Sequence, residues 1–271
     1  MTTPAFQFFA ATGTLAQLPL LQLERAGAVL HVRLNRPAKR NSISDELLTQ
    51  LHTVFVNVPK DIGCIVLSGA GPHFCAGLDL SELVERDIHS GVLHSRMWHA
   101  AFDAIQFGPT PVVAVLHGAV VGGGLELACA AHLRVAEPST FYAMPEGTHG
   151  IFLGGGGSVR ITRLVGVSRV TDLMLTGRVV TAQEGLPLGF SNYLVDEGQG
   201  LAKALELALK IAGNAPLSNY AITQALPRIA DLSAADGLFM ESLMSAIAQG
   251  DEAAKERVRA FLDKRAGKVG S

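Results

Sequence analysis

The 271-residue chain has few charged residues and few cysteines, and each shortage argues against a class of protein. Charged residues make up 17% of the chain and the formal net charge is −2, so no basic surface points to nucleic acid. The three cysteines are too few, and lie in too apolar a context, to indicate a disulfide framework or a metal site. No apolar run approaches the roughly 18 residues of a membrane span, and the N-terminus lacks the basic region of a signal peptide. The sequence therefore predicts a soluble, cytoplasmic protein without a membrane or nucleic-acid partner.

Apolar residues, by contrast, are plentiful at 48% of the chain, which is enough for a sizeable core. Residues 1–19 show no clear period and are expected to form a loosely attached arm. Over residues 20–200, β-branched runs alternate with helical segments, which predicts an α/β body. Residues 201–271 are expected to pack as helices on this body or on another subunit, and the helical patterns fall near 201–212, 216–226, 233–248 and 251–265.

The stretch from residue 111 to 132 contains the first candidate for a functional site. A buried strand at 111–116 is followed by Gly118 and then by three glycines, 122–124, that precede a helix. Glycines permit backbone conformations that a side chain forbids, and a helix start offers unpaired N–H groups to an electron-rich ligand. Glu126 is a carboxylate on the first turn of an otherwise apolar helix, which indicates a partner or a task.

Four further observations indicate structure or argue against metal and nucleotide sites. Asp79 and Glu82, three residues apart, are predicted to cap a helix. The histidines and the tryptophan of residues 82–107 do not have metal-ligand spacing, so they are predicted to line the core or a pocket. Glycines 154–157 are not followed by Gly-Lys-Ser/Thr, which argues against a phosphate-binding P-loop. No G-x-G-x-x-G motif opens the first strand–helix unit, which disfavours a dinucleotide-binding enzyme.

Several motifs together resemble the crotonase superfamily, the enoyl-CoA hydratase/isomerase family. The similar segments include an N-terminal signature, two oxyanion-hole segments, a second catalytic segment and two later landmarks. They lie at residues 35–44, 68–80, 111–131, 144–157, 175–178 and 261–265. The resemblance covers roughly residues 20–265, and the motifs are specific as a set although each alone is weak.

The resemblance implies an α/β fold, a spiral of ββα units, with a helical C-terminal region that builds trimers, often paired into hexamers. It also implies an acyl-CoA thioester as substrate, with no cofactor beyond the coenzyme A that the substrate carries. The family's two oxyanion donors carry over to the backbone N–H groups of Ala76 and Gly123. Two such donors stabilise an enolate oxygen more than the ground-state carbonyl.

In hydratases of this pattern two glutamates act around one water, and their positions carry over to Glu126 and Glu146. One carboxylate takes a proton from water as the water attacks Cβ, and the other, in its acid form, delivers a proton to Cα. The resemblance therefore favours an enoyl-CoA hydratase of fatty-acid metabolism. An enoyl-CoA isomerase or a hydratase-type lyase is an alternative, although an isomerase needs only one carboxylate. A non-catalytic acyl-CoA-binding protein is a further alternative.

The remaining expectations concern contacts with the substrate. Lys39 and Arg40 are expected to face the CoA phosphates, and Lys264 to reach CoA bound to a neighbouring subunit; each also fits an ordinary surface cation. His149 stands where aliphatic residues are usual in simple hydratases, and it either lines the acyl pocket or bonds to the loop backbone. The loop residues that the resemblance assigns to substrate contact are Ala76, Gly77, Leu78, Asp79, Leu80 and Gly122.

Overall fold

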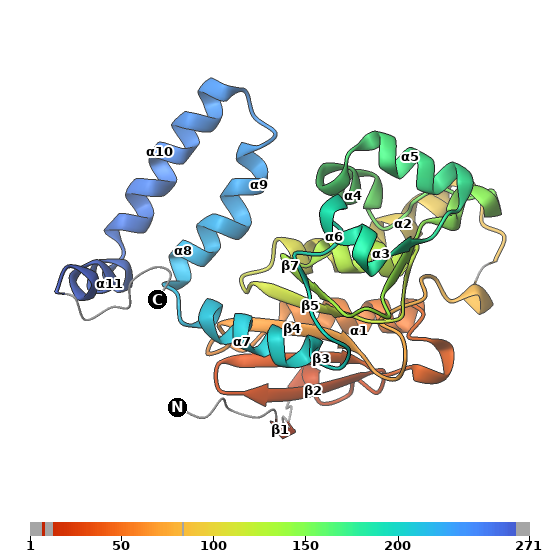
Figure 1. Ribbon diagram of the computed structural model, residues 1–271, viewed down its shortest axis with the longest axis horizontal. Helices are drawn as coiled ribbons and strands as arrows, with labels where there is room; N and C mark the ends of the chain where they lie inside the picture. Colours follow the sequence, from red (N-terminus) through yellow and green to blue (C-terminus); the bar gives the residue numbers. More distant parts are fainter. Residues whose placement is uncertain (1–6, 9–12, 83, 264–271) are drawn as a thin grey trace.

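The computed structural model describes residues 7–8, 13–82 and 84–263, and its centre is a twisted sheet (Figure 1). The first three strands of this sheet are antiparallel neighbours, and the remaining four are added in parallel. In spatial order the strands are β1 (Gln7–Phe8), β2 (Leu21–Ala26), β3 (Val29–Leu34), β4 (Cys64–Gly69), β5 (Val112–Leu116), β7 (Leu133–Ala136) and β10 (Tyr193–Leu194). The strands β2 and β3 form an antiparallel hairpin, and β1 adds a strand within the segment expected to be a loose arm.

A second, three-stranded sheet lies beside the first and was not expected from the sequence. It consists of β6 (Ala119–Val121), β8 (Phe141–Ala143) and β9 (Val180–Thr181). The prediction of a single glycine turn between the strand at 111–116 and the helix was therefore wrong. Gly118 has φ +54° and turns the chain out of β5, so that β6 pairs with β8 before the helix begins. The three residues of β6 carry no sequence pattern that would predict its pairing with β8, which lies about 20 residues later in the chain.

Helices cover both faces of the main sheet, because its strands are apolar on both sides. Along β4, Ile65 and Leu67 join the larger core cluster, whereas Cys64 and Val66 join a smaller one with α7 (Gly200–Ala212). Helices on the side of the larger cluster include α1 (Asp45–Val56), α2 (Ile88–Gln106) and α3 (Gly123–Ala130). Helix α1 begins at a side-chain cap, since the Ser44 hydroxyl accepts a hydrogen bond from the N–H of Leu47 at 3.1 Å.

The remaining helices form a group beside α3 and an extension (Figure 1). The group beside α3 consists of α4 (Gly157–Val165), α5 (Val167–Thr176) and α6 (Ala182–Leu188). The extension contains α8 (Pro216–Tyr220), α9 (Leu226–Ile229), α10 (Ala234–Gly250) and α11 (Glu252–Leu262), and it projects away from the sheet. No helix among residues 13–82 and 84–263 is long and apolar enough to cross a membrane.

One element of the extension differs from the sequence prediction of a continuous helix over 216–226. Residues Ala221–Ala225 form a π-helical turn, in which the N–H of Leu226 bonds to the carbonyl of Ala221. Pro227 follows at once and has no N–H to donate, so the regular α-helical ladder cannot continue through this point. The wider turn absorbs this missing hydrogen bond.

Candidate active site

A cavity of about 240 Å³ lies between α2, α3 and the loops that precede α4. Leu78, Trp98, Gly123, Glu126, Glu146 and Phe152 are among the residues that line it. These residues come from four segments that are distant in the sequence, so only the tertiary fold brings them together. His94 also lines the cavity, which confirms that the histidine-rich segment contributes to a pocket.

The glycines at the start of α3 are required by this close packing. Gly122 has φ +52°, and a β-carbon there would lie 2.8 Å from Oε1 of Glu146. A β-carbon on Gly123 would lie 2.7 Å from the Trp98 ring, closer than real contacts allow. The absence of side chains therefore lets Glu146 and Trp98 approach the first N–H groups of the helix.

Two backbone N–H groups at this point have no acceptor within the described part of the chain, and they belong to Gly123 and Leu78. Leu78 forms a parallel bridge with Ile43, in which Gly77 and Asp79 make the hydrogen bonds, so the N–H of Leu78 is directed to the other side. A β-carbon on Gly123 would lie 3.6 Å from the Leu78 nitrogen, which shows how close the two loops are. Two convergent donors beside a cavity can hold an oxyanion.

The assignment of Ala76 as the second oxyanion donor was wrong. The N–H of Ala76 donates to the carbonyl of Arg40 at 3.0 Å and is therefore occupied. Leu78, two residues later on the same loop, carries the free N–H. Gly77 between them has φ +96°, so the N–H groups of Ala76 and Leu78 point to different sides of the loop. The sequence does not show which of the two has a partner.

Glu126 is buried, with 3% of its surface exposed, on the first turn of α3. Its Oε1 accepts hydrogen bonds from the N–H groups of Gly157 at 2.7 Å and Gly155 at 2.9 Å. Burial raises the pKa of Glu126 to about 7; the bonds from the two glycines oppose this shift, and the charge of Glu146 adds to it. A carboxyl with a pKa near neutrality can both accept and donate a proton at physiological pH.

Glu146 lies in the short 3-10 helix Pro145–His149 and is 7% exposed. Its Oε2 is buried without a hydrogen-bond partner among the described residues, and burial raises the pKa of its carboxyl as well. The negative charge of Glu146 also contributes to the raised pKa of Glu126, after the larger effect of burial. No group of three histidine, cysteine, aspartate or glutamate side chains that could hold a metal ion occurs among residues 13–82 and 84–263.

The comparisons with known proteins agree with this geometry. Residues 24–270 match the family described as enoyl-CoA hydratase/isomerase. The chain belongs to this family. An enoyl-CoA hydratase of Mycobacterium tuberculosis (EchA19) is 32% identical over 249 residues, which are 90% of this chain and 94% of that protein. The 2,3-dehydroadipyl-CoA hydratase of Escherichia coli is 33% identical, with coverage of 90% and 96%.

Solved structures confirm the predicted crotonase fold of this family member. A crystal structure from Rhodopseudomonas palustris, of a protein provisionally named an enoyl-CoA hydratase, is similar with a TM-score of 0.90 and 54% identity. That similarity covers 94% of this chain and 98% of the other. The enoyl-CoA hydratase of Bacillus anthracis is similar with a TM-score of 0.85 and 31% identity, and the coverage is 90% and 96%. The family and the relatives support an enzyme of the hydratase type.

Three other residues of the loop after Leu78 have structural or exposed positions in this hydratase-family chain. Asp79 is buried; it pairs with Arg36 at 2.8 Å and accepts from the Ser81 N–H at 3.1 Å, so its carboxylate braces the loop as the predicted cap. The Ser81 and Arg36 hydrogen bonds lower the pKa of Asp79 to about 2. Glu82 caps α1 by accepting from the N–H of Asp45 at 2.7 Å. Leu80 is 72% exposed, outside the cavity.

The binding of CoA by Lys39, Arg40 and Lys264 stays a prediction. Lys39 and Arg40 are both exposed, and the Lys39 ammonium lies 3.9 Å from Oδ1 of Asp79. Arg40 has φ +52°, which places its peptide where the carbonyl can accept the Ala76 N–H. Lys264 lies outside the described residues.

His149 adopts the second of the two arrangements expected for it. Its ring is exposed, and Nδ1 lies 2.8 Å from the carbonyl of Pro145 within the same short helix. The ring is not among the groups that line the cavity. Its charge acts on Glu146 and lowers the pKa of that carboxyl, against the larger effect of burial.

Sequence reasoning missed the groups that hold Glu126 in place. The glycines at 154–157 were assigned to the second catalytic segment and excluded as a phosphate-binding loop, but their contact with Glu126 was not predicted; in the structure Gly155 and Gly157 donate to it. A buried carboxylate requires donors, and a glycine run ahead of a helix offers free N–H groups. A buried carboxylate together with a glycine run ahead of a helix could therefore have predicted this contact from the sequence.

Proposed function

We propose that this protein catalyses the reversible addition of water across the 2,3 double bond of an enoyl-CoA thioester. The observation that carries the proposal is one cavity that contains two free N–H groups and two buried carboxyls. The donors are Leu78 and Gly123, and the carboxyls are Glu126 and Glu146. Negative charge that develops on the thioester oxygen meets donors that are already in place.

In the proposed reaction the thioester carbonyl accepts hydrogen bonds from Leu78 and Gly123. Water between Glu126 and Glu146 loses a proton to one carboxylate as its oxygen bonds to Cβ. The enolate then takes a proton at Cα from the other glutamate in its acid form. One proton is taken and one is given, so the pair returns to its starting charge after a proton passes between the carboxyls. Water and the substrate supply every atom, and no cofactor beyond the substrate's coenzyme A is needed.

Retention of both carboxyls supports hydration over the alternatives. Movement of a double bond requires one group to carry a proton, so a second buried carboxyl would have no task in an isomerase. A non-catalytic binder would gain nothing from two poorly solvated carboxyls. The M. tuberculosis and E. coli relatives are both named hydratases.

We also propose that the protein assembles as a homotrimer or as a dimer of trimers through its C-terminal helices. Large apolar side chains are exposed along α10 and α11, where a monomer would leave them in water. They include Leu238, Phe239, Leu243, Ile247, Val258 and Phe261.

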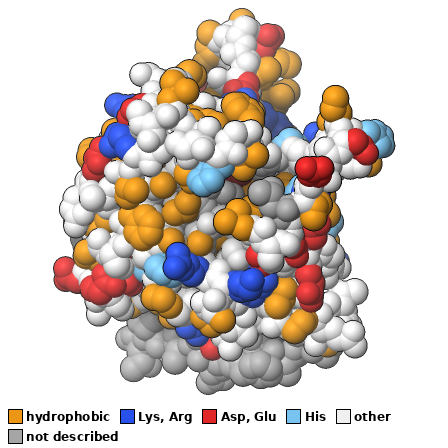
Figure 2. Space-filling model, turned by 90° about the vertical axis from the view of Figure 1, so that its right-hand side faces the viewer, with side chains coloured by type: hydrophobic (Ala, Val, Ile, Leu, Met, Phe, Trp, Pro, Cys, Tyr) orange, Lys and Arg blue, Asp and Glu red, His pale blue; other side chains and the backbone are white. Residues whose placement is uncertain are grey.

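On the face shown in Figure 2, hydrophobic side chains and charges of both signs are interspersed, without a wide field of one sign. A cytoplasmic location and a role in fatty-acid metabolism stay predictions.

The test of the reaction is the loss of enoyl-thioester absorbance when the protein is mixed with crotonyl-CoA. The Glu126→Gln and Glu146→Gln variants are each expected to lose about 10²–10⁴-fold in kcat, the usual contribution of a general acid or base. Glu85→Gln, at an exposed glutamate, is the matched control. Near wild-type turnover in either active-site variant would refute the assignment.

A further inference from the structure

Arg160 is a buried cation that the proposed reaction does not use directly. It lies in the first turn of α4, and its residue surface is 7% exposed. Its Nε donates to Oε1 of Gln106 at 2.6 Å, and its Nη1 donates to the carbonyl of Gly155 at 2.8 Å. Nη2 donates to the carboxylate of Asp103. The guanidinium therefore ties the C-terminal turns of α2 to the glycine loop before α4.

The same glycine loop holds the carboxylate of Glu126. The N–H of Gly155 donates to Oε1 of Glu126, while the carbonyl of Gly155 accepts from Arg160. Gly155 is therefore held through its N–H by the carboxylate of Glu126 and through its carbonyl by the guanidinium of Arg160. Gly156 has φ +94°, and a β-carbon there would lie 2.2 Å from Nη1 of Arg160, so the guanidinium packs directly against this turn of the loop.

We propose that Arg160 is a positioning residue for Glu126, which it holds at its working place through Gly155. The inference rests on the proposed hydration reaction for its kinetic consequence. A planar guanidinium with several fixed donors can hold a loop, a carboxylate and an amide at once, which a lysine ammonium cannot do with the same geometry. A shift of about 1 Å in a catalytic group costs on the order of 10²-fold in rate.

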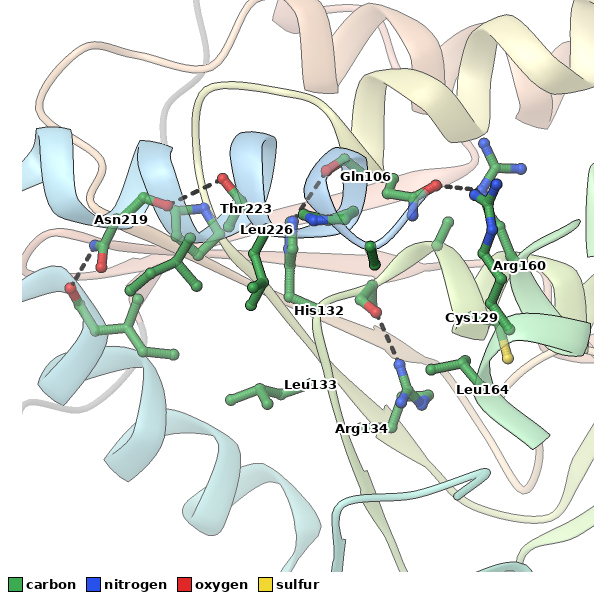
Figure 3. Close-up of a pocket in the computed structure, with 18 of the residues that line it drawn as sticks. Gln106, Cys129, His132, Leu133, Arg134, Arg160, Leu164, Asn219, Thr223 and Leu226 are labelled. Atoms are coloured by element: carbon green, nitrogen blue, oxygen red, sulfur yellow. Dashed lines mark hydrogen bonds between the residues drawn. The ribbon is translucent and has the colours of Figure 1, made fainter. Parts of the chain in front are cut away.

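The position of Arg160 also provides a direct chemical test. Its guanidinium lies at one end of a second cavity, of about 560 Å³, between the body and the helices α8 and α9 (Figure 3). Gln106 and Arg160 both line this cavity, and Figure 3 shows the hydrogen bond between them. Removal of the side chain would therefore leave a space that a free guanidinium ion can enter from this cavity.

The experiment compares Arg160→Ala and Arg160→Lys with Arg163→Ala. Arg163 lies on the same helix and lines the same cavity, but it pairs with Asp231 at 2.9 Å instead of with the glycine loop. We expect Arg160→Ala to lose about 10–10²-fold in kcat, with KM for crotonyl-CoA nearly unchanged. Millimolar guanidinium chloride should restore much of this loss, whereas urea or sodium chloride should not. Arg163→Ala should keep the wild-type kcat.

A pH profile separates positioning from a merely structural role. The charged groups that act on Glu126 are Glu146 and Arg160, and the arginine lowers the pKa of Glu126. Loss of the guanidinium should move one limb of the kcat profile to higher pH, whereas Arg160→Lys should lose kcat with a smaller displacement. An unchanged kcat in both variants, or a loss without pH displacement and without guanidinium rescue, would overturn the proposal.

Failure of the proposed hydration reaction can be distinguished from failure of the Arg160 inference. If the wild-type protein does not hydrate crotonyl-CoA, the reaction assignment fails, and the Arg160 inference is then tested by titration of Glu126 with NMR. A pKa of Glu126 that is unchanged by Arg160→Ala in the folded protein would overturn it. If Arg160→Ala does not fold, Arg160→Lys carries the same kinetic comparison.

Discussion

Replacement of Glu126 by glutamine should make the protein more stable at alkaline pH while it removes activity. The carboxyl is 3% exposed, and burial raises its pKa from 4.5 to about 7. Because the folded-state pKa is above the unfolded value, the unfolded chain loses this proton first as the pH rises. The free energy of unfolding therefore falls between about pH 4.5 and 7, and the loss is complete above that range. Glutamine does not ionise, and its oxygen can still accept from Gly155 and Gly157.

The size of the effect follows from the pKa shift. At about 1.4 kcal/mol for each unit, the ionised carboxylate costs about 3 kcal/mol at pH 8 and little at pH 4. Urea denaturation of the wild type and the Glu126→Gln variant at fixed protein concentration measures this difference, with Glu85→Gln as the control. A stability difference that is equal at pH 4 and pH 8 would show that Glu126 ionises normally, and the explanation by burial would then be wrong.

Three further predictions test the geometry around Glu126. Leu78→Pro, which removes the proposed oxyanion N–H, should lower kcat by about 10²–10³-fold in a protein shown by circular dichroism to be folded; Ala76→Pro instead breaks a structural bond, so a greater loss of thermal stability is expected there. Gly123→Ala should destabilise the fold by about 1–3 kcal/mol in urea titrations, since its β-carbon meets the Trp98 ring; unchanged stability would contradict the tight fit. His149→Leu should leave the ratio of kcat/KM for crotonyl-CoA and for a hydroxyaryl enoyl-CoA unchanged, because the ring lies outside the cavity; an altered ratio would place it at the substrate.

Local sequence patterns determined most of the elements. The β-branched runs predicted an α/β body over residues 20–200 and the strand at 111–116, and the capping side chains Ser44 and Thr181 at the starts of α1 and α6 are also local features. These features depend on residues that are neighbours in the chain, so they can be found without the fold. The glycine run and Glu126 on the first turn of α3 also indicated the site from the sequence alone, because a carboxylate in an apolar helix is unusual.

Only the tertiary structure decided which groups are free and which are held. The N–H of Ala76 is bonded to Arg40, in a segment well before it in the chain, and the free donor is therefore Leu78. The donors that hold Glu126 come from a loop about 30 residues later, and Arg160 holds that loop from its other side. A hydrogen bond between distant segments leaves no local pattern, and the burial that raises the pKa of a carboxyl exists only after those segments have packed together.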